Sequence, residues 1–375
     1  MNSNSVKQPM DKPIVEVHGL KKYFPIKSSF FKVTVGNVKA VDDVSFDIPA
    51  GTTLGVVGES GCGKTTMGRT MLRLYPITDG EVLYRGLSLH KLTVAQLKKA
   101  LPEEAKAVVG SDKESLLAYF EENGIDINKL SRAAMNKLRP DIQIIFQDPY
   151  SSLSPRLPIG EIIGEAVREH QIVPKEEFDD YITDIMLSCG LQEYHKDRYP
   201  HEFSGGQRQR ICIARALAMK PKVVVCDEPV SALDVSIQAQ IINLLKDLQK
   251  ERGLTYIFIS HDLSVVQHIS DNVAVMYLGS MVELTSKEEL FANPMHPYTK
   301  ALLSAIPVPD PEVKMNRIIL DGDLPSPANP PKGCKFHTRC SQCTERCREE
   351  APGFNEYKPG HFVACHLYDK ENSAE

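Results

Sequence analysis

The sequence contains no stretch of about 18 consecutive apolar residues, the length that a membrane-spanning helix requires. Its first residues, Met1 to Lys7, also lack the apolar core of a secretory signal peptide. We therefore expect the chain to stay in the cytoplasm.

Long runs of lysine or arginine are absent as well, and the formal net charge is −5. Proteins that bind nucleic acids neutralise phosphates with clustered cations, so the sequence argues against a nucleic-acid partner. The composition is ordinary for a globular protein, because 42% of the 375 residues are apolar and 25% are charged. This length allows about two or three domains and a sizeable core.

Residues 58–66 match the phosphate-binding pattern G-x-x-x-x-G-K-[ST]. An apolar run precedes them and a predicted helix follows, which is the strand, loop and helix order that this motif requires. Glycines let the backbone N–H groups turn inward, and the helix presents its positive dipole end to the phosphates. Lys64 adds a mobile cation and Thr65 a magnesium ligand. The nucleotide-binding residues predicted here are Gly58, Ser60, Gly61, Cys62, Gly63, Lys64, Thr65 and Thr66.

Two strand patterns precede this loop, at residues 14–17 and 38–48, with a separate segment between them. They predict a small β-subdomain. After the loop, residues 80–90 resume a strand-and-turn pattern, and residues 92–138 contain several helix-forming stretches. We expect 92–138 to form an inserted helical element.

Further apolar runs predict strands at 141–146, 222–226 and 255–259, with amphipathic helices between them. Strands that alternate with helices form a mostly parallel sheet, and ligands bind beyond the carboxyl ends of its strands. Each run ends in polar residues that are able to do chemistry: Gln147, Asp227 with Glu228, and Ser260 with His261.

A second glycine motif, Ser204-Gly205-Gly206-Gln207, follows Phe203. Together with the phosphate-binding loop and the polar strand ends, it makes the chain resemble the nucleotide-binding subunits of ABC transporters over about residues 12–300. The resemblance implies an α/β fold of the P-loop NTPase class, with a RecA-like parallel-sheet core, an antiparallel β-subdomain and a helical subdomain over 148–203. It also implies an ATPase that uses ATP and Mg²⁺.

The resemblance assigns a role to each polar strand end. Asp227 is expected to hold magnesium with Thr65 and Gln147, and Glu228 to polarise the attacking water as general base. His261 is expected to contact the γ-phosphate. The predicted catalytic residues are therefore Glu228, His261 and Gln147.

The adenine ring is expected to stack on an aromatic side chain upstream of the phosphate-binding loop. By resemblance this residue is Phe24, with Tyr23 as the alternative. Both lie in the segment that separates the first two predicted strands, and packing in the core is the other interpretation of either ring.

The second glycine motif is expected to open a helix over about residues 209–219, so that its free amides and serine hydroxyl form a second anion site. The resemblance implies that this motif covers ATP held by the P-loop of another subunit, in a head-to-tail dimer. Phe203 replaces the usual leucine with another apolar residue, so we expect a competent site. The additional nucleotide-binding residues predicted are Ser204, Gly205, Gly206, Gln207 and, in the D-loop, Asp234.

Longer segments narrow the resemblance to the ATPases of oligopeptide and dipeptide permeases, most like the second ATPase of their pair. The implied function is ATP hydrolysis that energises peptide import. The implied partners are a second ATPase subunit in a heterodimer, two transmembrane permease subunits and an extracytoplasmic peptide-binding protein, with this chain peripheral on the cytoplasmic face of the membrane. Nickel importers are an alternative. The matching segments are 39–46, 147–153, 199–203, 226–240 and 296–300.

The sequence divides into a disordered N-terminus over 1–11, an ATPase domain over 12–300 and a permease extension over 301–375, which is proline-rich after residue 305. Four cysteines match the spacing of the extension in this family, and four thiolates suit a [4Fe-4S] cluster. Tetrahedral zinc is an alternative, because Cys343 and the nearby His337 or His366 also offer ligands, and unmetallated thiols are another. The predicted cluster ligands are Cys334, Cys340, Cys347 and Cys365.

Overall fold

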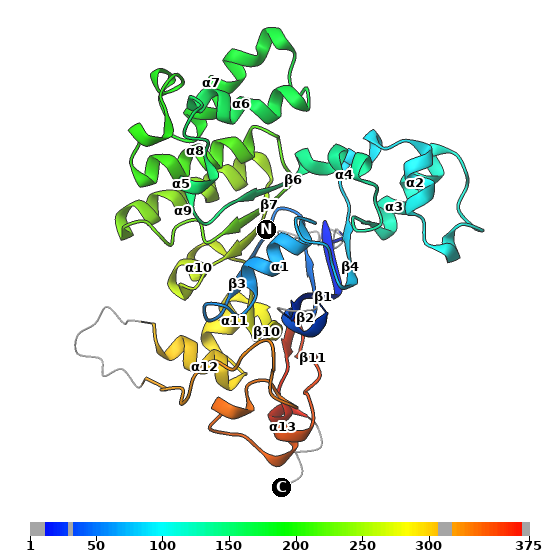
Figure 1. Cartoon of the computed structure of the whole chain (residues 1–375), viewed down its shortest axis with the longest axis vertical. Helices are drawn as coiled ribbons and strands as arrows, with labels where there is room; N and C mark the ends of the chain where they lie inside the picture. Colours follow the sequence, from blue (N-terminus) through cyan, green and yellow to red (C-terminus); the bar gives the residue numbers. More distant parts are fainter. Residues whose placement is uncertain (1–11, 29–32, 307–316, 370–375) are drawn as a thin grey trace, which may run out of the picture.

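A computed structural model describes residues 12–28, 33–306 and 317–369 of the chain (Figure 1). The predicted disorder of residues 1–11 lies outside these ranges. None of the helices in the described ranges is both long enough and apolar enough to cross a membrane.

The main sheet has the strand order β11-β12-β10-β9-β3-β8-β7-β6. Its parallel strands are mostly buried on both faces, which explains their continuous apolar sequences. The strands predicted before Gln147, Asp227 and His261 are confirmed as β6, β7 and β8. The parallel strands are β9 (Asn272–Tyr277), β3 (Thr53–Val57), β8 (Thr255–Ile259), β7 (Val223–Asp227) and β6 (Ile142–Ile145).

The sheet continues beyond β9 with antiparallel strands, which the sequence patterns did not predict. Two of them come from the C-terminal extension, so that part of the chain adds to the main sheet instead of folding separately. A buried hydrogen bond joins it there, because Nε2 of His361 lies 2.8 Å from Oε1 of Glu283. The antiparallel strands are β10 (Ser280–Ser286), β12 (His361–Val363) and β11 (Asn355–Lys358).

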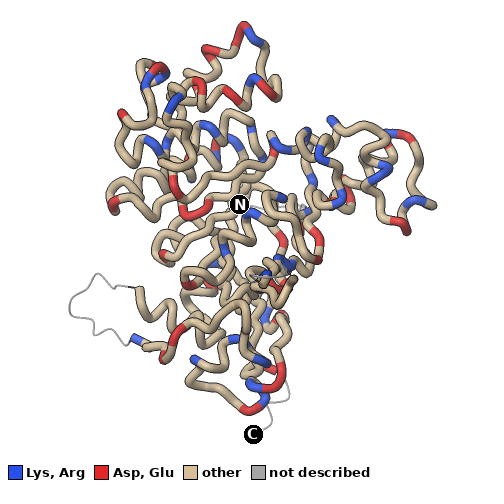
Figure 2. The backbone as a smooth tube through the Cα atoms, viewed as in Figure 1, with Lys and Arg blue, Asp and Glu red and all other residues tan. Residues whose placement is uncertain are grey.

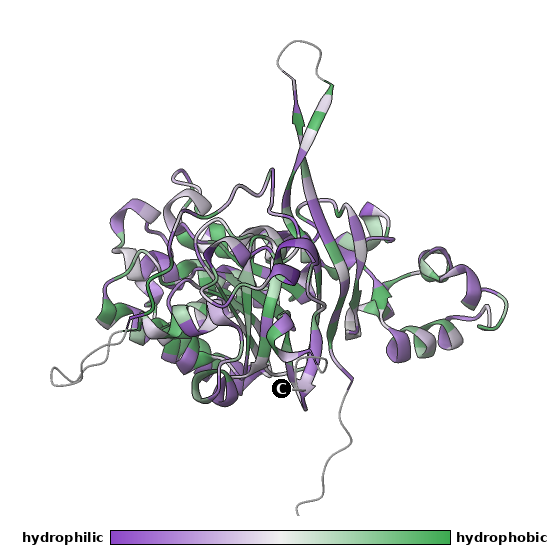
Figure 3. Cartoon of the chain, turned by 90° about the horizontal axis from the view of Figure 1, so that it is seen from below, coloured by the Kyte–Doolittle hydropathy of each residue, from purple (hydrophilic) through white to green (hydrophobic). Residues whose placement is uncertain are grey.

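A second, antiparallel sheet has the order β2-β1-β4-β5, which confirms the predicted β-subdomain. The sequence placed Tyr23 and Phe24 between two strands, and this was wrong: β1 runs through both of them. Irregularities in its register let the long strand bend and stay paired. Figure 3 shows β1 and β2 reaching beyond the body of the molecule. The strands are β1 (Val15–Lys27), β2 (Thr34–Ile48), β4 (Asp79–Tyr84) and β5 (Ile125–Asp126).

Helices occupy most of the insertion after β4, and polar residues cap them. Thr93 forms a capping box with Gln96, while Asp112 and Ser131 cap the next two helices. Buried apolar side chains of these helices share one core with β4 and with the P-loop helix. The insertion therefore packs on the β-subdomain. Its helices are α2 (Val94–Ala100), α3 (Lys113–Asn123) and α4 (Arg132–Leu138).

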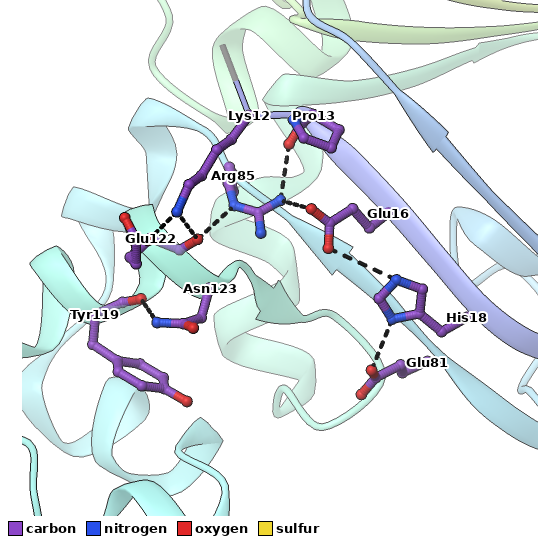
Figure 4. A network of polar contacts seen from close by, with 9 residues as sticks. All are labelled: Lys12, Pro13, Glu16, His18, Glu81, Arg85, Tyr119, Glu122 and Asn123. Carbon is purple, nitrogen blue, oxygen red and sulfur yellow. Dashed lines mark hydrogen bonds and ion pairs between the residues drawn. The ribbon is translucent and has the colours of Figure 1, made fainter. Parts of the chain in front are cut away.

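Arg85, just after β4, connects the β-subdomain to the insertion (Figure 4). Its guanidinium donates to Oε1 of Glu16 at 2.7 Å, to the Pro13 carbonyl at 2.9 Å and to the Glu122 carbonyl of α3 at 3.3 Å. Lys12 pairs with the carboxylate of Glu122. These bonds tie α3 to β1 through one half-buried side chain.

The remaining helices surround the main sheet. In Figure 1 the lobe formed by α6 and α7 lies at the top of the molecule, the insertion projects to the right, and the C-terminal part lies at the bottom. Acidic and basic residues are interspersed along most of the described chain (Figure 2). These helices are α1 (Lys64–Met71), α5 (Pro149–Ser152), α6 (Ile159–Glu169), α7 (Phe178–Ser188), α8 (Gly205–Leu217), α9 (Val235–Arg252), α10 (Leu263–Ile269), α11 (Lys287–Ala292), α12 (Pro297–Ser304) and α13 (Glu345–Glu349).

Candidate nucleotide site

A cavity of about 430 Å³ lies at the carboxyl ends of the parallel strands, where the strand ends, β2 and the phosphate-binding loop meet. A more apolar hollow of about 390 Å³ between α9 and α10 contains none of the predicted site residues. We take the first cavity as the site because all the predicted phosphate-binding residues except Gly58 and Cys62 line it. Its lining consists of Val38, Lys39, Ala40, Ser60, Gly61, Gly63, Lys64, Thr65, Thr66, Gln147, Glu228, His261, Gly279 and Pro327.

The phosphate-binding loop joins β3 to α1 in a conformation that requires glycine. Gly58 and Gly63 have φ angles of 150° and 108°. A Cβ atom on Gly58 would come within 2.2 Å of the Met276 carbonyl oxygen, and one on Gly63 within 2.1 Å of the Ala40 carbonyl oxygen. No side chain caps the start of α1, so its first amides remain available as donors to an anion.

Lys64 lies across this loop. Its buried ammonium donates to the carbonyl oxygen of Gly58 at 2.7 Å and to that of Glu59 at 3.1 Å. Cys62 is buried behind the loop, with its sulfur 4.0 Å from the Lys64 nitrogen. A cation and backbone donors thus converge on one short loop, which is the chemistry of a phosphate site.

The magnesium ligands predicted on the loop and on β7 are in direct contact. The Thr65 hydroxyl donates to Oδ1 of Asp227 at 2.6 Å, and Nη2 of Arg69 lies 3.3 Å from Oδ2 of Asp227. Burial raises the pKa of Asp227, and the hydrogen bond from Thr65 and the charge of Arg69 oppose that rise. This buried oxygen pair has the hard-ligand chemistry that Mg²⁺ prefers.

The three predicted catalytic side chains come together on one carboxylate oxygen. Nε2 of Gln147 donates to Oε2 of Glu228 at 2.9 Å, and Nδ1 of His261 lies 3.3 Å from the same oxygen. Glu228 has a positive φ of 46°, and its amide donates to the Ile259 carbonyl oxygen at 3.0 Å. A sparsely populated backbone conformation at the end of a buried strand is typical of functional residues.

The aromatic residues predicted to stack on adenine do not line the cavity. Phe24 pairs with Val38 in the β1–β2 register, and its half-buried ring packs edge-on against Tyr75 with centroids 5.6 Å apart. The Tyr23 hydroxyl donates to Asp42. The cavity wall beside Phe24 is made instead by residues of β2.

The second glycine motif lies outside the cavity and begins α8 at Gly205, four residues before the predicted start at Gln209. Ser204 accepts from the Gln207 amide at 3.3 Å, and Gln207 accepts from the Ser204 amide at 3.1 Å, a reciprocal cap that explains the early start.

Asp234 similarly caps α9 by accepting from the Ile237 amide at 3.0 Å. Ile237 packs against α8, because a Cβ on Gly206 would come within 2.6 Å of its Cγ2. The second glycine motif and the D-loop therefore form one surface, separate from the P-loop cavity.

The four predicted cluster cysteines gather within the extension. The Cys334 amide donates to the Cys347 carbonyl at 2.8 Å. Burial, together with smaller contributions from the neighbouring cysteines, raises the pKa of Cys334 to about 11 and that of Cys365 to about 12. Burial also raises the pKa of Cys340, and the nearby Cys347 and Cys343 raise it as well. Each thiol therefore has other thiols as its neighbours.

These cysteines, all of which lie within the described residues, are not brought together as a compact group of metal ligands. Among the residues with described side chains, the group whose ligand atoms all lie within 4.8 Å is Glu16, His18 and Asp47, on the surface of the β-subdomain. The cysteines of the described chain form no such group of three.

Several site residues were missed by the sequence reasoning. Arg69 follows Thr65 by one helical turn, so the helix spacing could have indicated it. Gly279 and Pro327 reach the cavity from distant parts of the chain, and the sequence carries no local signal for them.

Comparisons with known proteins identify the family of this chain. A model of the ABC transporter family matches residues 41–231, and a model of the oligopeptide/dipeptide transporter C-terminal region matches residues 282–347. The oligopeptide transport ATP-binding protein AppF of Bacillus subtilis is 51% identical, covering 95% of this chain and 97% of its own. The dipeptide transport ATP-binding protein DppF of Haemophilus influenzae is 46% identical, covering 98% of this chain and 100% of its own.

Solved structures resemble the fold as well. CbiO1 of Clostridium perfringens, part of the ABC transporter complex cbiONQ, aligns with a TM-score of 0.56 and 26% identity, covering 75% of this chain and 92% of its own. The ATP-binding cassette MJ0796, a dimer in a post-hydrolysis state bound to ADP and Pi, aligns with a TM-score of 0.56 and 24% identity, covering 73% and 98%. At that identity the second likeness shows the fold alone.

Proposed function

This chain belongs to the oligopeptide/dipeptide ABC transporter family as an ATP-hydrolysing subunit most like the second ATPase of the pair, and we propose which of its residues bind ATP and which hydrolyse it. The observation that carries the proposal is the meeting of Gln147 and His261 on Oε2 of Glu228, beside the phosphate-binding loop. In this arrangement Glu228 takes a proton from the water that attacks the γ-phosphate, and the products are ADP and phosphate.

The residues near Glu228 bind and orient ATP for this proton transfer. The P-loop amides and Lys64 hold the phosphates, while Thr65, Asp227 and Gln147 would hold Mg²⁺. When bound, the ion supplies positive charge to the phosphate oxygens. His261 stands beside the proton-accepting oxygen of Glu228, where it orients the carboxylate and contacts the γ-phosphate.

The second half of each ATP site comes from a partner subunit. Ser204, Gln207 and Asp234 are not among the residues that line the P-loop cavity, which supports the proposal that they cover a nucleotide held by another chain. We assign this partner as the other ATPase subunit of the transporter, in a head-to-tail heterodimer. The MJ0796 cassette, which shares the fold, is a dimer.

The remaining partners follow from the relatives, which are named as oligopeptide and dipeptide transport proteins. Within an ATPase domain over 12–300, the helical subdomain over 148–203 docks on two transmembrane permease subunits at the cytoplasmic face of the membrane. A peptide-loaded external binding protein then signals through those subunits.

In the extension over 301–375, the four gathered cysteines hold a [4Fe-4S] cluster. What supports this assignment over zinc is the match of the cysteine spacing in the sequence to the extension of the family, and four thiolates are the usual ligands of such a cluster.

The transport proposal is tested by reconstituting the chain with its permease subunits and paired ATPase in liposomes. ATP hydrolysis is measured with and without peptide-loaded binding protein, next to a Glu228→Gln complex. We expect peptide to stimulate hydrolysis and the substitution to abolish it. Hydrolysis that is stimulated by a nickel-loaded binding protein but not by a peptide-loaded one would contradict the peptide assignment.

A further inference from the structure

Glu59, the second residue of the phosphate-binding loop, is held by two residues from the C-terminal part of the chain. Nη1 of Arg339 donates to both carboxylate oxygens of Glu59, at 2.8 and 3.1 Å. The hydroxyl of Tyr298 on α12 accepts from the Glu59 amide at 2.9 Å. The Glu59 carbonyl accepts from Lys64 at 3.1 Å, so the bonds from the extension and the bond from the phosphate-binding lysine meet on one residue.

The environment of Arg339 favours a persistent ion pair. Its side chain is 10% exposed and that of Glu59 is 27% exposed, so water screens the pair less than it screens a surface pair. Burial alone lowers the pKa of Arg339, but its bonds to Glu59 and its interaction with Tyr277 raise it, which keeps the guanidinium charged. Charge-assisted bonds of this length are stronger than neutral ones.

The segment that carries Arg339 is itself rigidly packed. Phe336 is buried, and its ring lies 5.2 Å from that of Tyr277 and 5.4 Å from that of Tyr298. The Arg339 amide donates to the Phe336 carbonyl at 3.0 Å. Such aromatic contacts hold the backbone in place, so the position from which the Arg339 side chain extends to the loop is fixed.

A second contact brings the extension to the same cavity from another direction. The Pro327 carbonyl accepts from the Lys39 amide of β2 at 3.0 Å, and Pro327 lines the cavity. The extension thus contacts both the loop that binds the phosphates and the part of β2 that lines the same cavity.

We propose that Arg339 is a positioning residue of the nucleotide site: through Glu59 it fixes the phosphate-binding loop, so that the extension sets the affinity for MgATP. The inference rests on the nucleotide site proposed above. Since Arg339 immediately precedes Cys340, folding of the cysteine segment also determines whether this pair forms.

The test compares Arg339→Gln, Glu59→Gln and the double variant of the full chain, with Arg346→Gln as the matched control. Arg346 belongs to the same segment and pairs with Glu350 and Asp369, both within the extension. Binding of MgATP is measured by calorimetry, and KM and kcat are measured on the assembled transporter. We expect each single substitution to raise the Kd and KM for ATP roughly tenfold, and the double variant to be no worse than either single one.

The split between KM and kcat separates positioning from a general loss of folded protein. Misfolding removes active sites and lowers the apparent kcat at unchanged KM, whereas a loosened loop raises KM with kcat within about twofold. If Arg339→Gln does not fold, Glu59→Gln still breaks the pair while it leaves the extension intact.

Wild-type affinity in both single variants, or equal losses in Arg346→Gln, would overturn the inference. Losses that add up in the double variant would also overturn it, because two residues that act through one contact do not add. Failure of the wild-type chain to bind MgATP would instead contradict the nucleotide site itself.

Discussion

The hydroxyl of Thr65 donates a 2.6 Å hydrogen bond to Oδ1 of Asp227, which joins the start of the P-loop helix to the end of β7. The carboxylate it contacts is buried inside the fold, where a negative charge is poorly solvated. The magnesium-binding role proposed for this pair therefore comes with an electrostatic cost to stability.

Replacing Asp227 with Asn is expected to abolish most ATP hydrolysis without destabilising the nucleotide-free chain. The raised pKa of Asp227 means that the folded state holds a proton more tightly than the unfolded state. The carboxyl therefore contributes stability at low pH that is lost as pH rises through its folded pKa.

Thermal melts of both proteins from pH 4 to pH 8 test this. We expect the Asn variant to melt at or above wild type near neutral pH, and the difference to shrink as pH falls. A variant that melts well below wild type at pH 8 would show that the ion pair with Arg69 outweighs the burial of the charge.

Glu228→Gln is expected to lower kcat by roughly 10²- to 10⁴-fold, the usual contribution of a general base, while ATP binding remains. The amide keeps the size of the side chain and still contacts Gln147 and His261, but it cannot take a proton. Single-turnover hydrolysis and MgATP binding are measured together. The matched control is Glu251→Gln, an exposed residue on α9, and loss of ATP binding in the Glu228 variant would contradict the assigned role.

Ser204→Ala removes the side-chain cap of α8 and is expected to cost about 1 kcal/mol of helix stability. Because Ser204 faces away from the P-loop cavity of its own chain, we expect MgATP binding by the isolated chain to stay unchanged. Hydrolysis by the assembled heterodimer should fall. Weakened binding in the isolated chain would contradict the idea that this motif serves the nucleotide of a partner.

Cysteine substitutions distinguish the cluster from zinc. We expect Cys347→Ser to lose iron and acid-labile sulfide from anaerobically purified protein, together with visible absorbance. Cys343→Ser is the matched control, because its sulfur donates to the neighbouring Thr344 carbonyl and belongs to no family position. Stoichiometric zinc in place of iron, or an equal loss in both variants, would contradict the [4Fe-4S] assignment.

Arg85→Ala is expected to loosen the insertion, because the guanidinium of Arg85 bonds to Glu16, to the Pro13 carbonyl and to the Glu122 carbonyl (Figure 4). Losing half-buried, charged hydrogen bonds costs about 1.5–3 kcal/mol each. Hydrogen exchange in α2 and α3 should accelerate, while that of β7 and β8 should not. Arg168→Ala, which breaks an exposed pair with Glu161, serves as the control; acceleration across the whole chain would instead indicate global destabilisation.

Much of this structure could be predicted from local sequence patterns. The strands before Gln147, Glu228 and His261 were predictable, because a buried parallel strand needs a continuous apolar run and its polar end must lie at one edge of the sheet. The phosphate-binding loop was predictable because its glycines adopt a backbone conformation that other residues rarely accept. The residue roles came from motif resemblance and stay predictions.

Other features had no local signal. The course of β1 through Tyr23 was missed because irregularities in its register interrupt simple alternation. The early start of α8 was missed because a reciprocal cap, not apolar periodicity, decides where that helix begins.

The sequence by itself determined the class of chemistry, since phosphate binding depends on a few adjacent residues whose backbone shape is intrinsic. The tertiary structure alone decided what surrounds that chemistry. Pro327 reaches the cavity and Arg339 reaches Glu59 from the segment between α12 and β11, more than 200 residues away from the P-loop in the sequence. Contacts between residues so distant in sequence depend on chain topology and packing, which no local pattern encodes.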